Sequence, residues 1–147
     1  MSFNLSERQI NYLYDSWQLV NSDQDRIGKL FYERLFLLQP QMRVYFKTDN
    51  TSQISKFMST LTLLITKLHS GRTVYNDIQH LAQRHASYGT RPEHYAIIGE
   101  VLLWALENSL KEKWNADTKS AWSVLYEKIS ESMIGWSDVQ NDTPKVA

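Results

Sequence analysis

The 147-residue sequence contains no cysteine, few glycines and prolines (five and three), and no long hydrophobic run. Without cysteine the chain can form no disulfide, no thiolate-bound metal site and no thiolate nucleophile. The longest apolar runs, such as LTLLI, are far too short to span a bilayer. The 16 basic and 16 acidic side chains cancel, which argues against a binding surface for nucleic acid or for a membrane.

The chain length fits one domain with a sizeable core, so we expect a single domain over residues 1–147. The start, MSFNLSERQINYLYDSW, is polar and then amphipathic, which predicts no signal peptide and a cytoplasmic protein. The helical pattern is lost after Trp136, where Asn, Asp and Pro144 follow. We therefore expect an ordered core over about residues 5–136 and a flexible tail over 137–147.

Apolar residues recur at helical spacing almost throughout, and no stretch alternates with period two, which predicts an all-α fold of six to eight helices. Capping boxes at Ser6-x-x-Gln9 and Thr90-x-x-Glu93 predict two helix starts. The expected elements are a helix from Ser6 past Val20, a helix from about 26 to 38 with Leu38 facing inward, a short turn from Pro40 to Phe46, a loop over 47–52, and helices over 52–68, from 74 to the turn at Gly89, from 92 onward and from about Asn115.

Only four histidines could ligate a metal through nitrogen, and His85 lies on an apolar helical face with Ile78, Leu81 and Ala82. A histidine in such a place can be a core residue bonded to a backbone carbonyl, or it can be a metal ligand. His69 and His80 have no partner at metal-ligand spacing, so we interpret them as surface residues. For His94, in the first turn of its helix, the sequence favours an exposed or capping role.

Gln53 and Phe57 begin another apolar stripe upstream of His85. Fifteen residues separate Gln53 from Leu68, and eleven separate Val74 from His85, so two antiparallel helices could place these side chains opposite each other. A porphyrin is a flat apolar disc that needs such a slot. The large side chains positioned to line it are Phe46, Phe57, Leu61, Leu81, Ile98 and Leu102.

The segments LFYERLF, SQISKFM, LAQRHASYGTRPEHYAIIGEVLL and AWSVLY occur in this order, with Pro40 and Phe46 after the first. In this order and spacing, from about Leu5 to Trp136, the chain resembles a bacterial single-domain globin of the flavohaemoglobin-related group.

The resemblance implies a globin fold around haem b, with specific roles for individual residues. His85 would be the proximal iron ligand, Phe46 the aromatic wedge against the porphyrin, and Tyr32 and Gln53 the distal pair, with Phe57 as their apolar neighbour. Tyr95 matches a proximal-side tyrosine of the group. Where flavohaemoglobins have an acidic residue on the last helix, the ungapped continuation has Ser137, which argues against peroxidase-like chemistry.

The expected function is tight, reversible binding of oxygen or another diatomic gas, such as nitric oxide or carbon monoxide, at a five-coordinate iron. The Tyr32 hydroxyl and the Gln53 amide are both hydrogen-bond donors, and each bond to a charged ligand is worth about 1.5–3 kcal/mol. One alternative is nitric-oxide dioxygenation, which leaves ferric iron and so requires a separate reductase. A further alternative is a gas sensor acting through a partner protein, or a helical interaction module without haem.

Overall fold

A computed structural model describes residues 4–45, 50–87 and 91–142 of the chain. Six α-helices and two short 3-10 helices follow one another, and these ranges contain no strand, which confirms the all-α prediction. The elements are α1 (Glu7–Asn21), α2 (Gln24–Leu38), η1 (Pro40–Tyr45), α3 (Asn50–His69), α4 (Tyr75–Ser87), α5 (Pro92–Leu110), η2 (Lys111–Lys113) and α6 (Ala116–Asp142). Within the described residues, no helix combines the length and apolar character that a membrane span requires.

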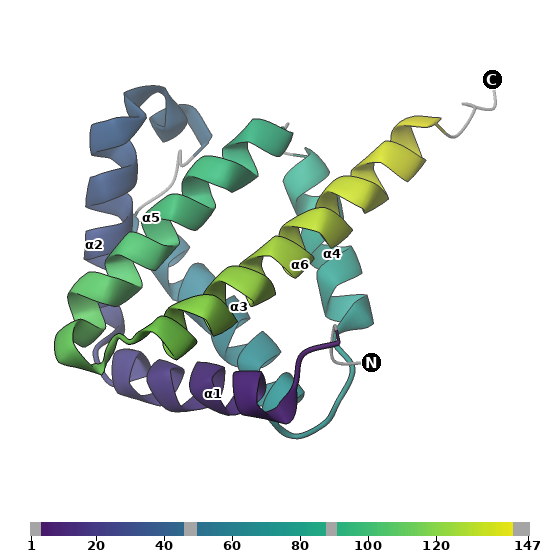
Figure 1. The fold of residues 1–147 in the computed structure, drawn as a ribbon. Helices are drawn as coiled ribbons and strands as arrows, with labels where there is room; N and C mark the ends of the chain where they lie inside the picture. Colours follow the sequence, from purple (N-terminus) through teal and green to yellow (C-terminus); the bar gives the residue numbers. More distant parts are fainter. Residues whose placement is uncertain (1–3, 46–49, 88–90, 143–147) are drawn as a thin grey trace.

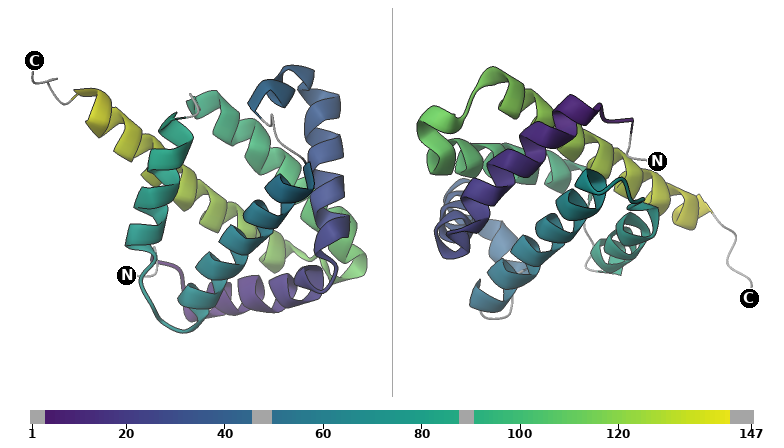
Figure 2. Two further views of the ribbon diagram at one scale, coloured as in Figure 1. Left: turned by 180° about the vertical axis from the view of Figure 1, so that it is seen from behind. Right: turned by 90° about the horizontal axis from the view of Figure 1, so that it is seen from below.

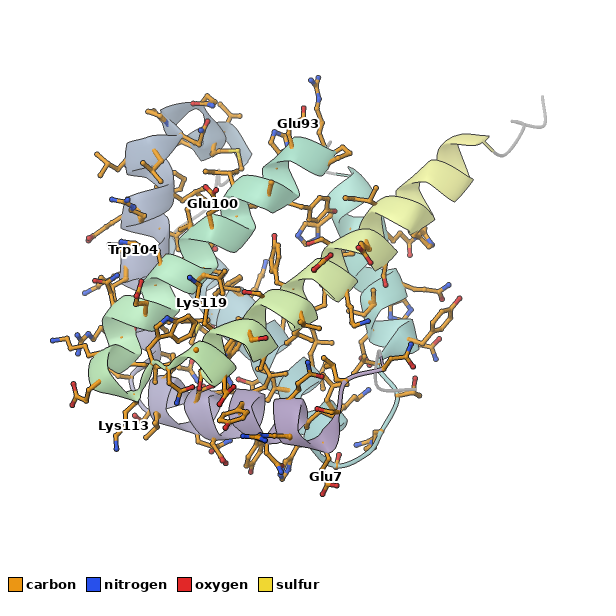
Figure 3. All side chains as sticks on the ribbon, in the orientation of Figure 1. Glu7, Glu93, Glu100, Trp104, Lys113 and Lys119 are labelled. Atoms are coloured by element: carbon orange, nitrogen blue, oxygen red, sulfur yellow. The ribbon has the colours of Figure 1, made fainter. Side chains whose placement is uncertain are left out.

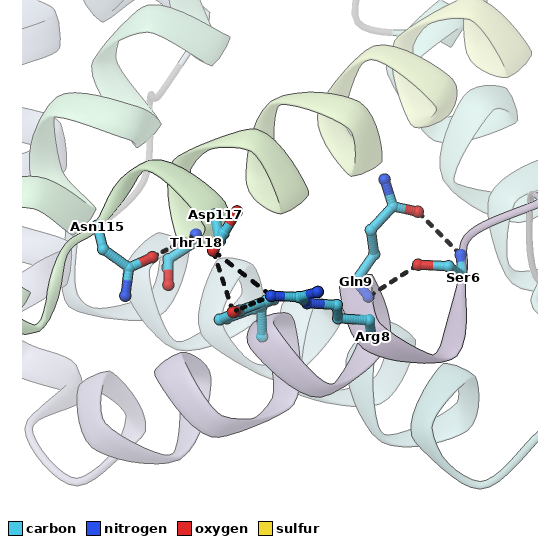
Figure 4. A network of polar contacts seen from close by, with 7 residues as sticks. Ser6, Arg8, Gln9, Asn115, Asp117 and Thr118 are labelled. Atoms are coloured by element: carbon cyan, nitrogen blue, oxygen red, sulfur yellow. Dashed lines mark hydrogen bonds and ion pairs between the residues drawn. The ribbon is translucent and has the colours of Figure 1, made fainter.

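The first helix begins at the predicted capping box. The Ser6 hydroxyl accepts from the Gln9 backbone N–H at 3.0 Å, and the Gln9 side chain accepts from the Ser6 N–H at 2.8 Å (Figure 4). One turn later the Tyr12 hydroxyl donates to Asp117 Oδ2 at 3.1 Å, which ties α1 to the start of α6. The capping box therefore satisfies the first turn of α1, and the Tyr12–Asp117 bond holds this end of α1 against α6.

Three helix boundaries differ from the sequence prediction. Helix α3 begins at Asn50, inside the expected loop over 47–52. Helix α5 is capped at Arg91 and not at Thr90: the Arg91 backbone N–H donates to His94 Nδ1 at 3.0 Å, which confirms the capping role of His94. Helix α6 continues past Trp136 to Asp142, because each residue added to an existing helix adds a hydrogen bond even without an apolar face.

Two tryptophans join three helices in the core. The rings of Trp17 in α1 and Trp122 in α6 lie with centroids 5.8 Å apart, and both are almost fully buried. Trp122 Nε1 donates to Ser16 Oγ at 2.9 Å, and Trp17 Nε1 donates to Thr62 Oγ1 of α3 at 3.0 Å, so neither buried indole N–H lacks an acceptor. By contrast Leu38, expected to face inward, is 43% exposed at the end of α2.

Helices α2 and α4 stand on opposite sides of the molecule, with α3 and α5 crossing between them on opposite faces (Figures 1 and 2). Helix α2 packs mainly on α5, and α4 packs mainly on α6. Figure 3 shows the described side chains on all six helices. Any group held between α2 and α4 would therefore meet side chains of α3 and α5 as well.

Candidate functional site

His85 lies near the end of α4, is half-buried, and has its ring oriented by its own helix. Nδ1 is 2.9 Å from the Leu81 carbonyl oxygen, one turn earlier. A carbonyl oxygen can only accept, so Nδ1 carries the proton and the neutral ring has its lone pair on Nε2. A core histidine would make the same bond, but the arrangement is also the one that orients metal-binding histidines.

The surroundings of His85 keep its ring neutral. Burial lowers the pKa of His85 from its ordinary value, and the positive charge of Arg84 lowers it further, while the bond to Leu81 acts in the opposite direction. A neutral imidazole is the form that binds a metal. The part of the chain that the structure describes contains no group of three or more His, Cys, Asp or Glu side chains that could hold a metal ion.

A tyrosine pair supports the side of the site that His85 occupies. The ring of Tyr95 in α5 lies 6.3 Å from the His85 ring, with an angle of 29° between the planes. The Tyr126 hydroxyl of α6 donates to the Tyr95 backbone oxygen at 2.6 Å. Burial raises the pKa of both tyrosines, so both remain protonated at neutral pH. The sequence predicted a proximal role for Tyr95 but none for Tyr126, although Tyr126 ends the segment AWSVLY.

Most of the expected apolar lining is only half-buried by the protein itself. Phe57, Leu81 and Ile98 pack against the core without being covered by it. Leu61 and Leu102 are different, because they are 8% and 2% exposed and belong to the core. The lining residues available to an apolar group are therefore Phe57 on α3, Leu81 on α4 and Ile98 on α5.

On α2, Tyr32 belongs to an aromatic cluster. The centroid of its ring is 5.0 Å from that of Phe31, in an edge-to-face arrangement, and 5.9 Å from that of Phe36. Phe31 in turn stacks on Phe57 of α3, with ring centroids 4.7 Å apart. Tyr32 is 5% exposed, and burial raises its pKa to about 12. Its hydroxyl is therefore protonated at neutral pH and can donate a hydrogen bond.

Two predicted site residues cannot be placed in the same detail. Phe46 lies outside the described residues. Gln53 lies in the first turn of α3, but its side chain is outside the described part of the chain. Helix α4 contains Leu81 and His85, and α5 contains Tyr95 and Ile98. Tyr32 lies on α2 and Phe57 on α3, and Figure 2 shows how these four helices are arranged.

These features fit a haem group. One neutral imidazole on α4 supplies a single nitrogen ligand, which is what a porphyrin-bound iron needs from a protein on one side. The half-buried residues Phe57, Leu81 and Ile98 are apolar, as a porphyrin face requires. Tyr32 adds a hydrogen-bond donor from a different helix.

The globin family profile matches residues 29–133, a range that includes Tyr32, His85 and Tyr126. The chain therefore belongs to the globin family, and its six helices form a globin fold, as predicted. Membership implies a haem-binding, gas-binding protein.

The relatives have several functions. The chain is 23% identical over 148 residues to a neuroglobin of Danio rerio, covering 90% of this chain and 93% of the relative. It is 26% identical over 134 residues to a flavohemoprotein of Rhodopirellula baltica, covering 89% of this chain but 33% of the relative. It is 24% identical over 133 residues to anaerobic nitrite reductase GLB0 of Physcomitrium patens, covering 80% of this chain and 74% of the relative. The chain thus spans about a third of the flavohemoprotein's length, and relatives at this identity assign no specific activity to it.

Proposed function

We propose that this globin holds haem b through Nε2 of His85 and binds a diatomic gas tightly and reversibly on the opposite side of the haem. The observation that supports this most is the Nδ1–H bond to the Leu81 carbonyl, which leaves the lone pair of the neutral ring on Nε2. Bound haem would supply the iron to which the gas attaches. Phe57, Leu81 and Ile98 would contact the porphyrin, together with Phe46, and the protein would resemble bacterial single-domain globins of the cytoplasm.

In this proposal Tyr32 and Gln53 act as donors toward the ligand. Oxygen gains negative charge when it binds ferrous haem, and a hydrogen bond to a charged acceptor contributes about 1.5–3 kcal/mol. The raised pKa of Tyr32, about 12, keeps its hydroxyl protonated. One such bond slows oxygen release about ten- to hundredfold. Oxygen is therefore the favoured ligand, ahead of nitric oxide and carbon monoxide.

The test compares His85 with a second histidine of the same helix. Titration of the purified protein with haemin should give a strong Soret band, and His85→Gly should lose it or shift it until imidazole is added. His80→Gly is the matched control, because His80 is exposed on α4. A His85→Gly spectrum identical to that of the wild-type protein would exclude His85 as the ligand. A protein that stays colourless with haemin would contradict haem binding altogether.

Tyr32→Phe tests the donor role on the other side. Oxygen dissociation, measured by stopped flow after displacement by carbon monoxide, should become at least about tenfold faster because one charge-assisted hydrogen bond is lost. Phe retains the ring contacts with Phe31 and Phe36, so the packing of α2 is preserved. An unchanged rate would remove Tyr32 from the site.

Nitric-oxide dioxygenation is a second candidate, favoured by the protonated Tyr32, because slow oxygen release suits oxygen consumption better than oxygen delivery. The overall reaction joins nitric oxide and oxygen into nitrate and leaves ferric iron, so an electron-donating reductase is required for turnover. Sustained nitric-oxide consumption with a supplied reductase and NADH would support this candidate. A single stoichiometric burst would favour ligand binding alone.

A further inference from the structure

Arg43 of η1 lies over an aromatic ring at the end of α2. Its guanidinium carbon is 4.5 Å from the centroid of the Phe36 ring, and Phe36 is 8% exposed while Arg43 is exposed. This is the geometry of a cation–π contact, in which the positive guanidinium is attracted to the negative face of the ring. Because η1 packs directly on α2, Arg43 covers Phe36 from the solvent side.

Phe36 in turn lies against Tyr32. The two residues are four apart on α2, their ring centroids are 5.9 Å apart, and their planes are inclined by 31°. The rings of Phe31 and Tyr32 lie perpendicular to each other, with their centroids 5.0 Å apart. Among the described residues Tyr32 thus contacts the rings of Phe31 and Phe36, and the exposed Arg43 lies over Phe36. The orientation of Phe36 therefore bears directly on that of the Tyr32 ring.

We propose that Arg43 is a positioning residue for Tyr32, acting through Phe36. The proposal rests on the ligand-binding role proposed for Tyr32 above. With the guanidinium in place, Phe36 keeps one orientation and limits the rotation of the Tyr32 ring, whose hydroxyl is at the far end of that ring. Hydrogen bonds weaken steeply as distance and angle depart from ideal values, so small ring movements change the strength of the bond that Tyr32 donates.

The chain contains a matched control for Arg43. Arg34 is a residue of α2, and its guanidinium carbon lies 4.8 Å from the centroid of the Trp104 ring of α5. This is the same kind of contact, formed by a residue only two positions after Tyr32, but its aromatic partner is on another helix. Removal of Arg34 therefore costs a similar contact without touching the Phe36–Tyr32 pair.

The test uses the haem-loaded protein. Arg43→Ala and Arg34→Ala are each made in the wild-type and Tyr32→Phe backgrounds, with Arg43→Lys to keep the positive charge. We expect Arg43→Ala to speed oxygen dissociation about two- to fivefold, the size of an exposed cation–π contact, and to move the C–O stretching frequency of the carbon monoxide complex. Arg34→Ala should leave the dissociation rate and the C–O frequency unchanged. Arg43→Lys, which keeps the positive charge, should change both less than Arg43→Ala does.

The Tyr32→Phe background decides the mechanism. If Arg43 acts through the Tyr32 hydroxyl, Arg43→Ala has no further effect on dissociation once that hydroxyl is absent. An equal acceleration in both backgrounds, or the same change with Arg34→Ala, would overturn the proposal and leave Arg43 as a residue of general stability.

A second measurement does not depend on ligand binding. In haem-free protein labelled with 3-fluorotyrosine, the ¹⁹F resonance of Tyr32 is assigned by its loss in Tyr32→Phe. This resonance should move or broaden in Arg43→Ala and stay in place in Arg34→Ala. A fixed resonance in both variants would contradict the link through Phe36. If the resonance moves in protein that never binds haemin, the proposed function fails while the coupling of Arg43 to Tyr32 stands.

Discussion

At the scale of single residues, the candidate site consists of groups kept neutral by burial. Burial lowers the pKa of His85 and raises the pKa of Tyr32 to about 12, so one ring can bind a metal and the other can donate a hydrogen bond. Neither depends on a neighbouring opposite charge. Desolvation is the largest cause of both shifts and favours the protonation states that gas binding would need, and it has a measurable effect on stability.

The raised pKa of Tyr32 predicts a loss of stability in alkaline solution. In the unfolded chain its phenol ionises near the ordinary value of 10.0, whereas in the folded protein it stays protonated up to about 12. Deprotonation above pH 10 therefore favours the unfolded state, and the contribution of Tyr32 falls by about 1.4 kcal/mol per pH unit between these two values. Below pH 10 this contribution is fully present.

Urea unfolding at pH 8, 9.5 and 11 measures this effect. We expect the wild-type protein to lose about 1 kcal/mol more than Tyr32→Phe between pH 9.5 and 11, because the variant lacks the buried phenol. Tyr75→Phe, which removes a hydroxyl from a side chain that is 66% exposed, should follow the wild-type curve. Parallel wild-type and Tyr32→Phe curves would show that Tyr32 ionises equally easily in both states.

At the scale of helices, Gly99 brings α5 and α6 together. A Cβ at Gly99 would lie 2.6 Å from Cε2 and 2.8 Å from Cδ2 of the Tyr126 ring. That ring cannot easily move aside, because its hydroxyl donates to the Tyr95 backbone oxygen at 2.6 Å. The absence of a side chain at Gly99 thus permits the Tyr126 bond that anchors the first turn of α5.

Gly99→Ala should therefore destabilise the fold by about 1–3 kcal/mol, the usual cost of overpacking. Gly135→Ala in α6 is the opposite case, since nothing lies within 4 Å of its added Cβ, and it should stabilise by up to about 1 kcal/mol through helix propensity. Thermal unfolding of the two variants gives the comparison. In a Tyr126→Leu background the cost of Gly99→Ala should shrink, and an undiminished cost there would mean that another contact is responsible.

The sequence predicted those parts of each helix that depend on local interactions. The capping box at Ser6 and Gln9 is confirmed, because it follows from spacing along one helix. The predicted cap of α5 at Thr90 was wrong, because the ring nitrogen of His94 takes the place of the side-chain oxygen that capping patterns assume. The prediction that Leu38 faces inward was wrong, because helical spacing identifies a face of a helix but cannot tell where the neighbouring element ends.

The candidate site was predicted less completely than the helices. His85, Tyr32 and Tyr95 could be chosen from the sequence, but the bond from Tyr126 to the Tyr95 backbone joins residues 31 positions apart and leaves no local pattern. Gly99 likewise has a reason only once α6 is packed against α5. Such tertiary contacts determine the support behind the site, and periodicity contains no information about them.

At the scale of the whole molecule, the helices differ in how many other helices they pack against. Helix α1 contacts α2, α3, α5 and α6, whereas the extensive contact of α4 within the described part of the chain is with α6 alone. The N-terminal end of α4 is tied to α3 by the Lys67–Asp77 ion pair at 2.9 Å, and Ile78 and Ala82 are buried. At the other end of α4 His85 is half-buried. A group bound by His85 would add packing contacts at this end.

This inequality predicts how haem changes local stability. In haem-free protein, backbone amides in the second half of α4 should exchange with deuterium at least about tenfold faster than those in the middle of α1, because α1 packs on four helices and α4 packs extensively on one. Haem bound to His85 favours the closed helix and should slow this exchange strongly, with a smaller change in α1. His85→Gly with haemin present should keep the fast exchange of the haem-free protein. If α4 is as protected as α1 without haem, its own packing on α6 is sufficient, and the proposed iron ligand would lie on a preformed helix that gains no stability from the cofactor.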